Sequence, residues 1–95
     1  MSRDSYEQLL AIVRRVIHKW DPYCLIEGGA PQDEFDHEIA TVAARVKTMK
    51  TEQDCISVLS SVFSDSFEAI LFTPELCARE GRELFTELKN AGFIQ

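Results

Sequence analysis

The sequence predicts an all-α protein, a compact bundle of four helices, and three observations lead to that fold class. Apolar residues recur at steps of three and four in four separate segments, which is the spacing that lines one face of a helix. Helix-capping residues, prolines and glycines stand between those segments. No segment shows the sustained alternation of apolar and polar residues that is typical of strands. The length of 95 residues and the hydrophobic fraction of 45% suit a single domain over residues 1–95.

The first helix is expected over residues 4–20. Asp4 and Glu7 have the spacing of a capping box, with Asp in place of the usual Ser or Thr. Pro22 disfavours helical backbone angles in the residue before it, so the helix should end at about Trp20. The apolar face that should pack into the core consists of Tyr6, Leu9, Leu10, Val13, Val16, Ile17 and Trp20.

A loop over residues 21–30 follows, in which Leu25 and Ile26 should tuck beneath a pair of glycines. The second helix is expected to begin at Pro31, because proline is favoured in the first turn, and to run to about Lys50. Its apolar residues follow the helical spacing without a gap, and this is the most regular pattern in the chain. They are Phe35, Ile39, Val42, Val46 and Met49.

The third helix is expected over residues 52–64. Thr51 can cap it, and Asp54 stands in the position of the second capping-box residue. Its apolar face consists of Cys55, Val58, Leu59, Val62 and Phe63. The pattern over residues 65–72 leaves two alternatives, a buried extended segment or a short helical turn.

The fourth helix is expected over residues 74–90, because Thr73-Pro74 combines a capping residue with a first-turn proline. Glycine costs about 1 kcal/mol relative to alanine inside a helix, so Gly81 in the middle of the apolar face indicates a close helix crossing. A glycine stop at Gly92 should let Phe93 and Ile94 fold back onto the helix. The apolar face is formed by Cys77, Gly81, Leu84 and Leu88.

Charge, hydropathy and cysteine usage exclude several classes of protein. The net charge of −6 argues against nucleic acid as a direct ligand, because phosphate binding needs clustered Lys and Arg. No apolar run approaches the roughly 20 residues of a membrane span, and the first residues lack the apolar core of a secretory signal, so we expect a cytoplasmic protein. Three irregularly spaced cysteines suit neither a disulfide framework nor a zinc ribbon. Cys55 and Cys77 lie on apolar faces, which leaves Cys24 as the one candidate for a reactive thiol.

The densest group of ionisable residues lies between Asp21 and Glu38. Phe35 and Ile39 should face inward, so the neighbouring acids and His37 should fan around the outward side of the second helix. One interpretation is an acidic surface that receives a basic protein partner, with a tyrosine as the nearest aromatic anchor. The other is that acids in the first turn only complement the helix dipole, at about 0.3–1 kcal/mol each. The candidate partner-binding residues are Tyr23, Glu27, Asp33, Glu34, Asp36 and Glu38.

Metal binding and catalysis find little support in the sequence. Asp33 and His37 share a helix face and Asp36 is adjacent, but these supply two or three ligands where a closed site needs four, and His18 lies on another helix. The glycine pair lacks the Lys and Ser or Thr of a phosphate-binding loop. No motif joins Cys24 to a histidine. We therefore expect no metal, no cofactor and no enzymatic activity.

Three short elements in the first half of the chain resemble a known signature: Trp20-Asp21-Pro22, Gly29-Ala30-Pro31 and Asp33-Glu34-Phe35-Asp36-His37-Glu38-Ile39. They are similar to the motif of a YugE-like family of small helical bacterial proteins of unknown function, in which tyrosine usually stands where this chain has Phe35. Similar runs occur in immunity proteins of contact-dependent growth-inhibition and polymorphic toxin systems. The resemblance implies an all-helical fold and no enzyme activity.

The resemblance also leads to an expectation about function, an immunity protein that binds and neutralises a cognate bacterial toxin domain. The acidic cluster favours a nuclease-type toxin with a basic cleft, because carboxylates can occupy positions otherwise taken by substrate phosphates. The alternative is a stand-alone cytoplasmic housekeeping or regulatory protein of the same fold with an unknown partner. A toxin gene beside this one would separate the two.

Overall fold

The computed structural model describes residues 2–22, 27–29, 31 and 33–94, and in these residues all regular structure is helical. The fold class predicted from the sequence is confirmed. The elements in chain order are α1 (Arg3–Trp20), α2 (Asp36–Ala44), the 3-10 helix η2 (Val46–Thr48), α3 (Glu52–Ser66), the 3-10 helix η3 (Ala69–Leu71) and α4 (Ala78–Asn90). The expected placement of Leu25 and Ile26 lies outside the described residues.

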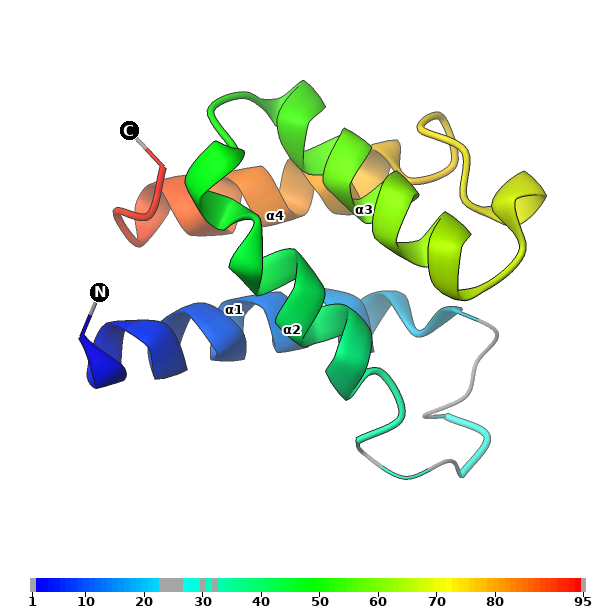
Figure 1. Ribbon diagram of the computed structural model, residues 1–95, viewed down its shortest axis with the longest axis horizontal. Helices are drawn as coiled ribbons and strands as arrows, with labels where there is room; N and C mark the ends of the chain where they lie inside the picture. The colour runs from blue at the N-terminus through cyan, green and yellow to red at the C-terminus, as the bar shows by residue number, and fades with distance from the viewer. Residues whose placement is uncertain (1, 23–26, 30, 32, 95) are drawn as a thin grey trace.

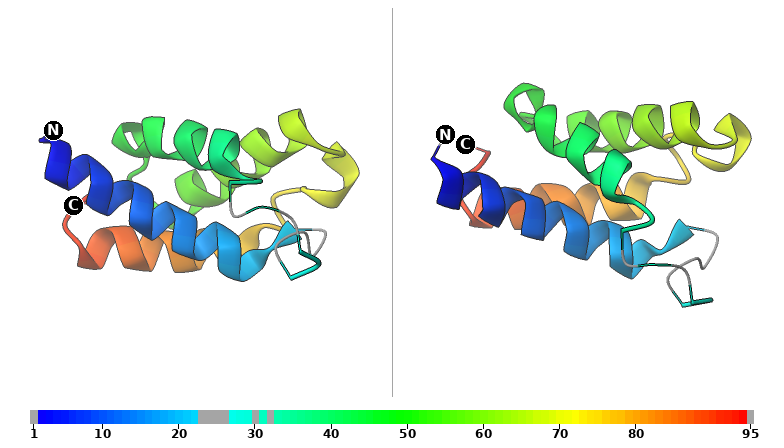
Figure 2. Two further views of the ribbon diagram at one scale, coloured as in Figure 1. Left: turned by 90° about the horizontal axis from the view of Figure 1, so that it is seen from below. Right: turned by 60° about the horizontal axis from the view of Figure 1, so that its bottom comes forward.

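The four α-helices enclose one core, and each of them packs against two others (Figure 1). The first and last helices, α1 and α4, lie side by side, α3 packs on α4, and α2 joins α1 to α3. Two ion pairs link α1 to α4, from Lys19 to Glu83 and from Arg15 to Glu87. The two chain ends lie together at one end of the bundle (Figure 2). At the other end lie η3 and the described part of the loop that follows α1.

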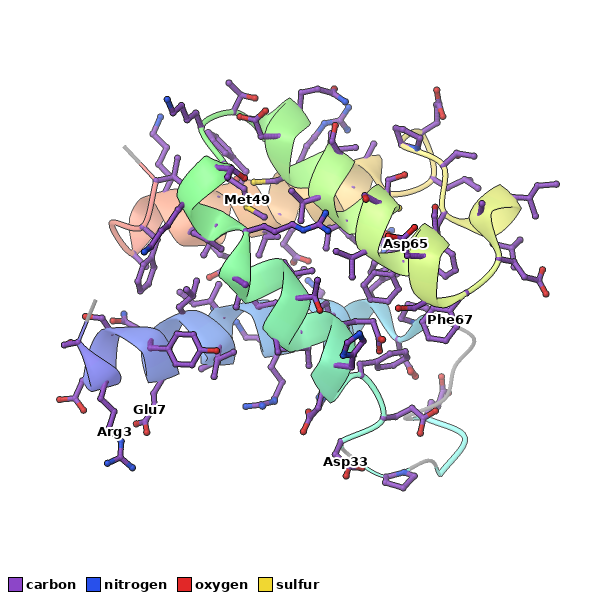
Figure 3. The ribbon with its side chains drawn as sticks, viewed as in Figure 1. Arg3, Glu7, Asp33, Met49, Asp65 and Phe67 are labelled. Carbon is purple, nitrogen blue, oxygen red and sulfur yellow. The ribbon has the colours of Figure 1, made fainter. Side chains whose placement is uncertain are left out.

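The start of α1 differs from the prediction. Ser2 is the N-cap, because its hydroxyl accepts a hydrogen bond from the backbone N–H of Ser5 at 3.2 Å. Asp4 lies inside the first turn, and Glu7 pairs with Arg3 on the surface (Figure 3). The predicted Asp4–Glu7 capping box is therefore wrong, since a serine two residues earlier occupies the capping position. Tyr6 is 43% exposed although it continues the apolar face, and it lines a hollow formed with the end of α2 and η2.

The second helix is shorter than predicted. It begins at Asp36 rather than Pro31, and its N-cap, Phe35, makes no side-chain cap hydrogen bond. The physical reason is that the residue before Pro31 is an alanine, which has no oxygen to cap the first turn. The helix also ends at Ala44 and tightens into η2. Its apolar face is nevertheless buried throughout, as predicted: Phe35, Ile39, Val42, Val46 and Met49.

The third helix begins as predicted and runs two residues further, to Ser66. Its capping box is complete: Asp54 N–H donates to the Thr51 hydroxyl at 3.1 Å, and Thr51 N–H donates to the Asp54 carboxylate at 3.1 Å. A further hydrogen bond from the backbone N–H of Lys50, at 2.8 Å, is the main reason that the pKa of Asp54 lies below its ordinary value.

The turn after α3 is the short helical alternative, because η3 occupies Ala69–Leu71. It is not buried, however: Ile70 and Leu71 are exposed, and only Phe72 enters the core. Two serines of α3 hold this turn in place, because both donate hydrogen bonds to the carbonyl oxygen of Phe72. The Ser60 hydroxyl lies 2.6 Å from this oxygen and the Ser64 hydroxyl 3.3 Å.

The fourth helix begins at Ala78 rather than at Pro74. Residues 74–77 form a turn instead, in which the Thr73 hydroxyl accepts a hydrogen bond from Leu76 N–H. The predicted glycine stop is confirmed. Gly92 has a φ of 88°, Phe93 N–H donates to the Leu88 carbonyl at 2.9 Å, and Ile94 is buried.

The predicted close crossing at Gly81 is also confirmed. A Cβ atom at Gly81 would lie 2.8 Å from Cα of Ile56 and 2.9 Å from its backbone nitrogen, distances that side-chain carbons do not tolerate. Glycine is therefore needed for the approach of α4 to α3, rather than for a special backbone angle. The predicted face of α4, from Cys77 through Leu84 to Leu88, is fully buried.

Candidate interaction surface at the distal end

The end of the bundle opposite the two chain ends, which we call the distal end, brings together segments far apart in the sequence. It contains the described residues of 20–38 and the segment 65–76, where α1 and α3 end and α4 is about to begin (Figures 1 and 2). Neither 20–38 nor 65–76 contains a Lys or an Arg. These two segments therefore bring acidic side chains, and no Lys or Arg, to the distal end.

Three of the predicted partner-binding residues lie exposed in the loop before α2: Glu27, Asp33 and Glu34. Figure 3 shows Asp33 on the outside of this loop, away from the helices. Within the described part of the chain, none of these three carboxylates forms an ion pair. Asp36 is also exposed, and a single long contact of 3.8 Å joins it to Arg14 of α1. Tyr23, the predicted aromatic anchor, lies outside the described residues.

Glu38 does not belong to this exposed set. It is only 6% exposed, and its carboxylate accepts a hydrogen bond from the hydroxyl of Ser66 at 3.0 Å. The expectation that Glu38 faces solvent is wrong because the end of α3 covers that side of α2. A buried, hydrogen-bonded carboxylate that joins two helices serves architecture rather than recognition.

Asp21 also has a local structural role. It ends α1 in the left-handed conformation, with a φ of 47°, and its carboxylate accepts a hydrogen bond from Glu27 N–H at 3.0 Å. Asp tolerates this conformation better than most residues. The loop thus begins with a defined bend that carries Glu27 to the surface.

His18 lies on α1, and the fold places it beside two of the predicted partner-binding acids, Asp33 and Asp36. Arg14, His18, Asp33 and Asp36 line one shallow hollow of about 310 Å³. Nε2 of His18 is buried and makes no hydrogen bond. Among the residues that the structure describes, no group of three or more His, Cys, Asp or Glu side chains is placed to hold a metal ion.

Sequence reasoning missed an exposed apolar cluster at the distal end, formed by Ile70, Leu71 and Leu76. Their exposed fractions are 76%, 45% and 56%. A groove of about 270 Å³ runs beside them, and it is lined by Trp20, Pro22, Leu71, Phe72 and Leu76. One signal for this cluster was in the sequence, since Leu76 falls outside the apolar face predicted for the fourth helix.

A second hollow, of about 390 Å³, adjoins the groove at Trp20 and has a different chemistry. Lys19, Trp20, Arg79, Glu80 and Glu83 line it. Lys19 and Glu83 neutralise each other, with Nζ and Oε1 2.7 Å apart. Glu80 is only 8% exposed, and its Oε2 atom is buried without a hydrogen bond. The distal end therefore offers an apolar groove beside a carboxylate that lacks part of its hydrogen bonding.

Aromatic rings form the floor beneath the groove. The Trp20 ring packs against Phe63 and Phe72, with centroid distances of 4.8 and 5.7 Å. Phe67 stacks on Phe63 at the end of α3 (Figure 3). Such contacts hold large side chains in one arrangement, so the groove is a preformed surface.

Two of the cysteines are core residues, as predicted. Cys55 and Cys77 are fully buried, and burial raises the pKa of each thiol to about 11. Thiols with such pKa values stay protonated near neutral pH and are poor nucleophiles. Cys24, the candidate for a reactive thiol, lies outside the described residues.

Comparison with known proteins adds no family to this picture, because no family model, curated protein or solved structure matches the chain. No helix in the described residues is both long enough and apolar enough to cross a membrane.

Proposed function

We propose that this chain is a binding protein that neutralises a cognate bacterial toxin domain, in the manner of an immunity protein, and that it binds a basic surface of that toxin. The observation that carries the proposal is the distal end, where exposed carboxylates from two segments lie beside exposed aliphatic side chains. The signature around Trp20-Asp21-Pro22 and Asp33–Ile39 supports the toxin as the class of partner. A nuclease-type toxin suits this surface best, because its cleft is built to attract phosphates.

The electrostatics of α3 favour recognition over stability at this end. Its last turn contains no basic residue, and Asp65 lies there, near the negative end of the helix dipole (Figure 3). A carboxylate in that position lowers helix stability by about 0.3–1 kcal/mol when exposed. A basic partner bound beside Asp65 would offset this repulsion between the carboxylate and the helix dipole.

The helix-dipole alternative accounts for some of the acids in the loop but not for all. Asp36 is in the first turn of α2, where a negative charge stabilises the helix. Asp33 and Glu34 precede the N-cap, and neither side chain accepts a hydrogen bond from a described backbone amide of α2. Exposed charges of this kind raise the association rate with an oppositely charged partner.

The second candidate function is a stand-alone cytoplasmic housekeeping or regulatory protein with an unknown partner. The same exposed acidic and aliphatic side chains would serve to bind such a partner, whereas the signature around Trp20-Asp21-Pro22 favours the toxin. The gene neighbourhood separates the two functions. A large adjacent gene with a variable C-terminal toxin domain favours immunity, and its absence favours the alternative.

The direct test is protection and binding with the toxin domain encoded beside this chain. Co-expression should rescue growth, and calorimetry should give one-to-one binding. Asp33→Lys with Glu34→Lys should slow association at low salt by about tenfold or more, because complementary charge acts mainly on the association rate. The matched control is Asp4→Lys with Glu7→Lys, which changes the charge equally at the other end of α1.

Absence of both protection and binding by the wild-type protein would overturn the proposal. Equal association rates for the distal pair, the control pair and wild type would show instead that the acidic loop does not face the toxin.

A further inference from the structure

We infer that the apolar groove at Trp20 and the adjoining hollow at Glu80 form a single docking site for a basic, amphipathic protein segment. An aliphatic or aromatic side chain of that segment would enter the groove, and a Lys or Arg beside it would reach Glu80. That this segment belongs to a toxin rests on the proposed function. The chemistry of the segment is argued from the docking site alone.

The exposed aliphatic side chains are held on a rigid support. Phe72, which lines the groove, is packed on Trp20, and its carbonyl oxygen accepts the hydrogen bond from Ser60. Ile70 and Leu71 immediately precede it in η3. An ordered turn that presents exposed Ile and Leu at a protein surface is typical of interaction sites, because binding then has little conformational entropy to remove.

Glu80 supplies the polar half of the site. Its carboxylate is buried, and its nearest cation is the Nε of Arg79, 3.4 Å away, on a side chain that is 92% exposed. The oxygen in this contact is Oε2, which is itself buried and makes no hydrogen bond at that distance. A buried carboxylate oxygen that lacks a hydrogen bond lowers the stability of the fold. An ammonium or guanidinium group from a partner would supply the missing bond by displacing the exposed Arg79 side chain.

Charge selects the occupant. The two cations that line the hollow, Lys19 and Arg79, are each paired with a carboxylate of α4. Beside the groove, Glu68 and Glu75 are exposed, and no Lys or Arg occurs between Lys50 and Arg79. A nucleic acid or an anionic lipid surface would meet repulsion here. A second copy of this chain in symmetric contact would bring the same carboxylates together. A segment with Lys or Arg beside its apolar anchors is the occupant that this surface attracts.

The two hollows share Trp20, which sets the spacing of the ligand. The apolar anchor and the cation of the partner must therefore lie on neighbouring positions of one face, as at i and i+3 or i+4 of a helix. Trp20 would contact both, with its ring against the anchor and beside the cation.

The first experiment tests this chemistry without any toxin. The probe is a helical peptide with Leu at i, i+3, i+4 and i+7 and Lys elsewhere, titrated into isotope-labelled protein and followed by NMR. We expect saturable shifts at Leu71, Leu76 and the Trp20 indole, and none with a peptide in which Glu replaces every Lys. Shifts that spread over the surface without these three, or equal binding of both peptides, would overturn the inference.

Variants of the groove provide the second measurement. Leu71→Ser with Leu76→Ser should weaken peptide binding at least about tenfold, since buried aliphatic anchors dominate such interfaces. Glu80→Gln should weaken it less and reduce its dependence on salt. Tyr6→Ser is the matched control, because Tyr6 is also an exposed large apolar residue but lies on the first turns of α1. Leu71, Leu76 and Tyr6 are exposed, and Glu80→Gln keeps the shape of the side chain, so melting curves should show all variants folded.

The same variants, measured against the adjacent toxin domain, separate the two proposals. If the toxin binds wild type and the groove variants equally, the docking site is wrong and the immunity function stands. If the basic peptide occupies the groove but no toxin binds, the docking site stands and the immunity function is wrong.

Discussion

Replacing Gly81 with alanine should lower the free energy of unfolding, although the same change stabilises most helices. The glycine lies in α4, where this helix crosses α3 at Ile56. A Cβ atom would stand 2.8 Å from Cα of Ile56 and 2.9 Å from its nitrogen. Non-bonded carbon atoms prefer about 3.5–4.0 Å, so the two helices have to separate by roughly 1 Å.

Two opposing contributions determine the size of the effect. Alanine is favoured over glycine in a helix interior by about 1 kcal/mol. Overpacking a core costs about 1–3 kcal/mol, and the upper part of this range applies because backbone atoms cannot rotate out of the way. The free energy of unfolding should therefore fall by about 1–2 kcal/mol, which lowers the Tm by about 4–16 °C for a domain of this size.

Thermal and urea denaturation followed by circular dichroism would measure the change. Thr86→Ala, at an exposed position of the same helix, is the control and should leave the Tm unchanged or slightly higher. Adding Ile56→Ala should not remove the penalty at Gly81, because the Cα and nitrogen of residue 56 remain. A Tm for Gly81→Ala equal to or above that of wild type would refute the close-crossing argument.

Four further predictions concern the turn after α3, the two buried thiols and the metal content. Ser60→Ala should lower the free energy of unfolding by about 1–2 kcal/mol, measured by urea denaturation, because the Phe72 carbonyl loses its shorter hydrogen bond. In a Cys24→Ser protein, Cys55 and Cys77 should react with an aromatic disulfide reagent at pH 8 only after denaturation; reaction in the folded state would contradict their burial. Because burial raises their pKa values to about 11 from 9.0, stability should be independent of these thiols below pH 9 and should fall between about pH 9 and 11, where the unfolded chain ionises first. Elemental analysis should find no stoichiometric metal, and a chelator should not shift the Tm; one bound equivalent of zinc would disprove this.

The apolar patterns predicted the core well because burial depends on which face a residue occupies more than on the exact form of the helix. The face from Phe35 to Met49 is buried although the helix between them breaks at Ala44. A 3-10 turn rotates each residue only slightly more than an α-helix does, so Val46 and Met49 still point inward. Helix boundaries were less predictable, because they depend on capping groups. The second helix was predicted to begin at Pro31, and it begins five residues later at Asp36.

The candidate site was only partly predictable because exposure depends on neighbours that a single helix does not reveal. The pattern of α2 placed Glu38 outward, and only the end of α3 explains its burial under Ser66. For Ile70 and Leu71 the pattern left a buried extended segment and a short helical turn as alternatives, and the Phe72 anchor holds the pair outside the core in the helical turn. Tertiary contacts of this kind leave no periodic signal in the sequence.

The side-by-side placement of α1 and α4 has a consequence for synthesis on the ribosome. Lys19 and its partner Glu83 are 64 residues apart, which corresponds to about 3–13 s of translation at roughly 5–20 residues per second. During that interval the apolar face of α1 has no α4 to cover it, and only α2 and α3 can shield it. The groove at Trp20 is likewise incomplete until Leu76 has emerged. A partly made chain lacks first Leu76 and then Glu80, so the proposed docking site is complete only once the start of α4 has been made.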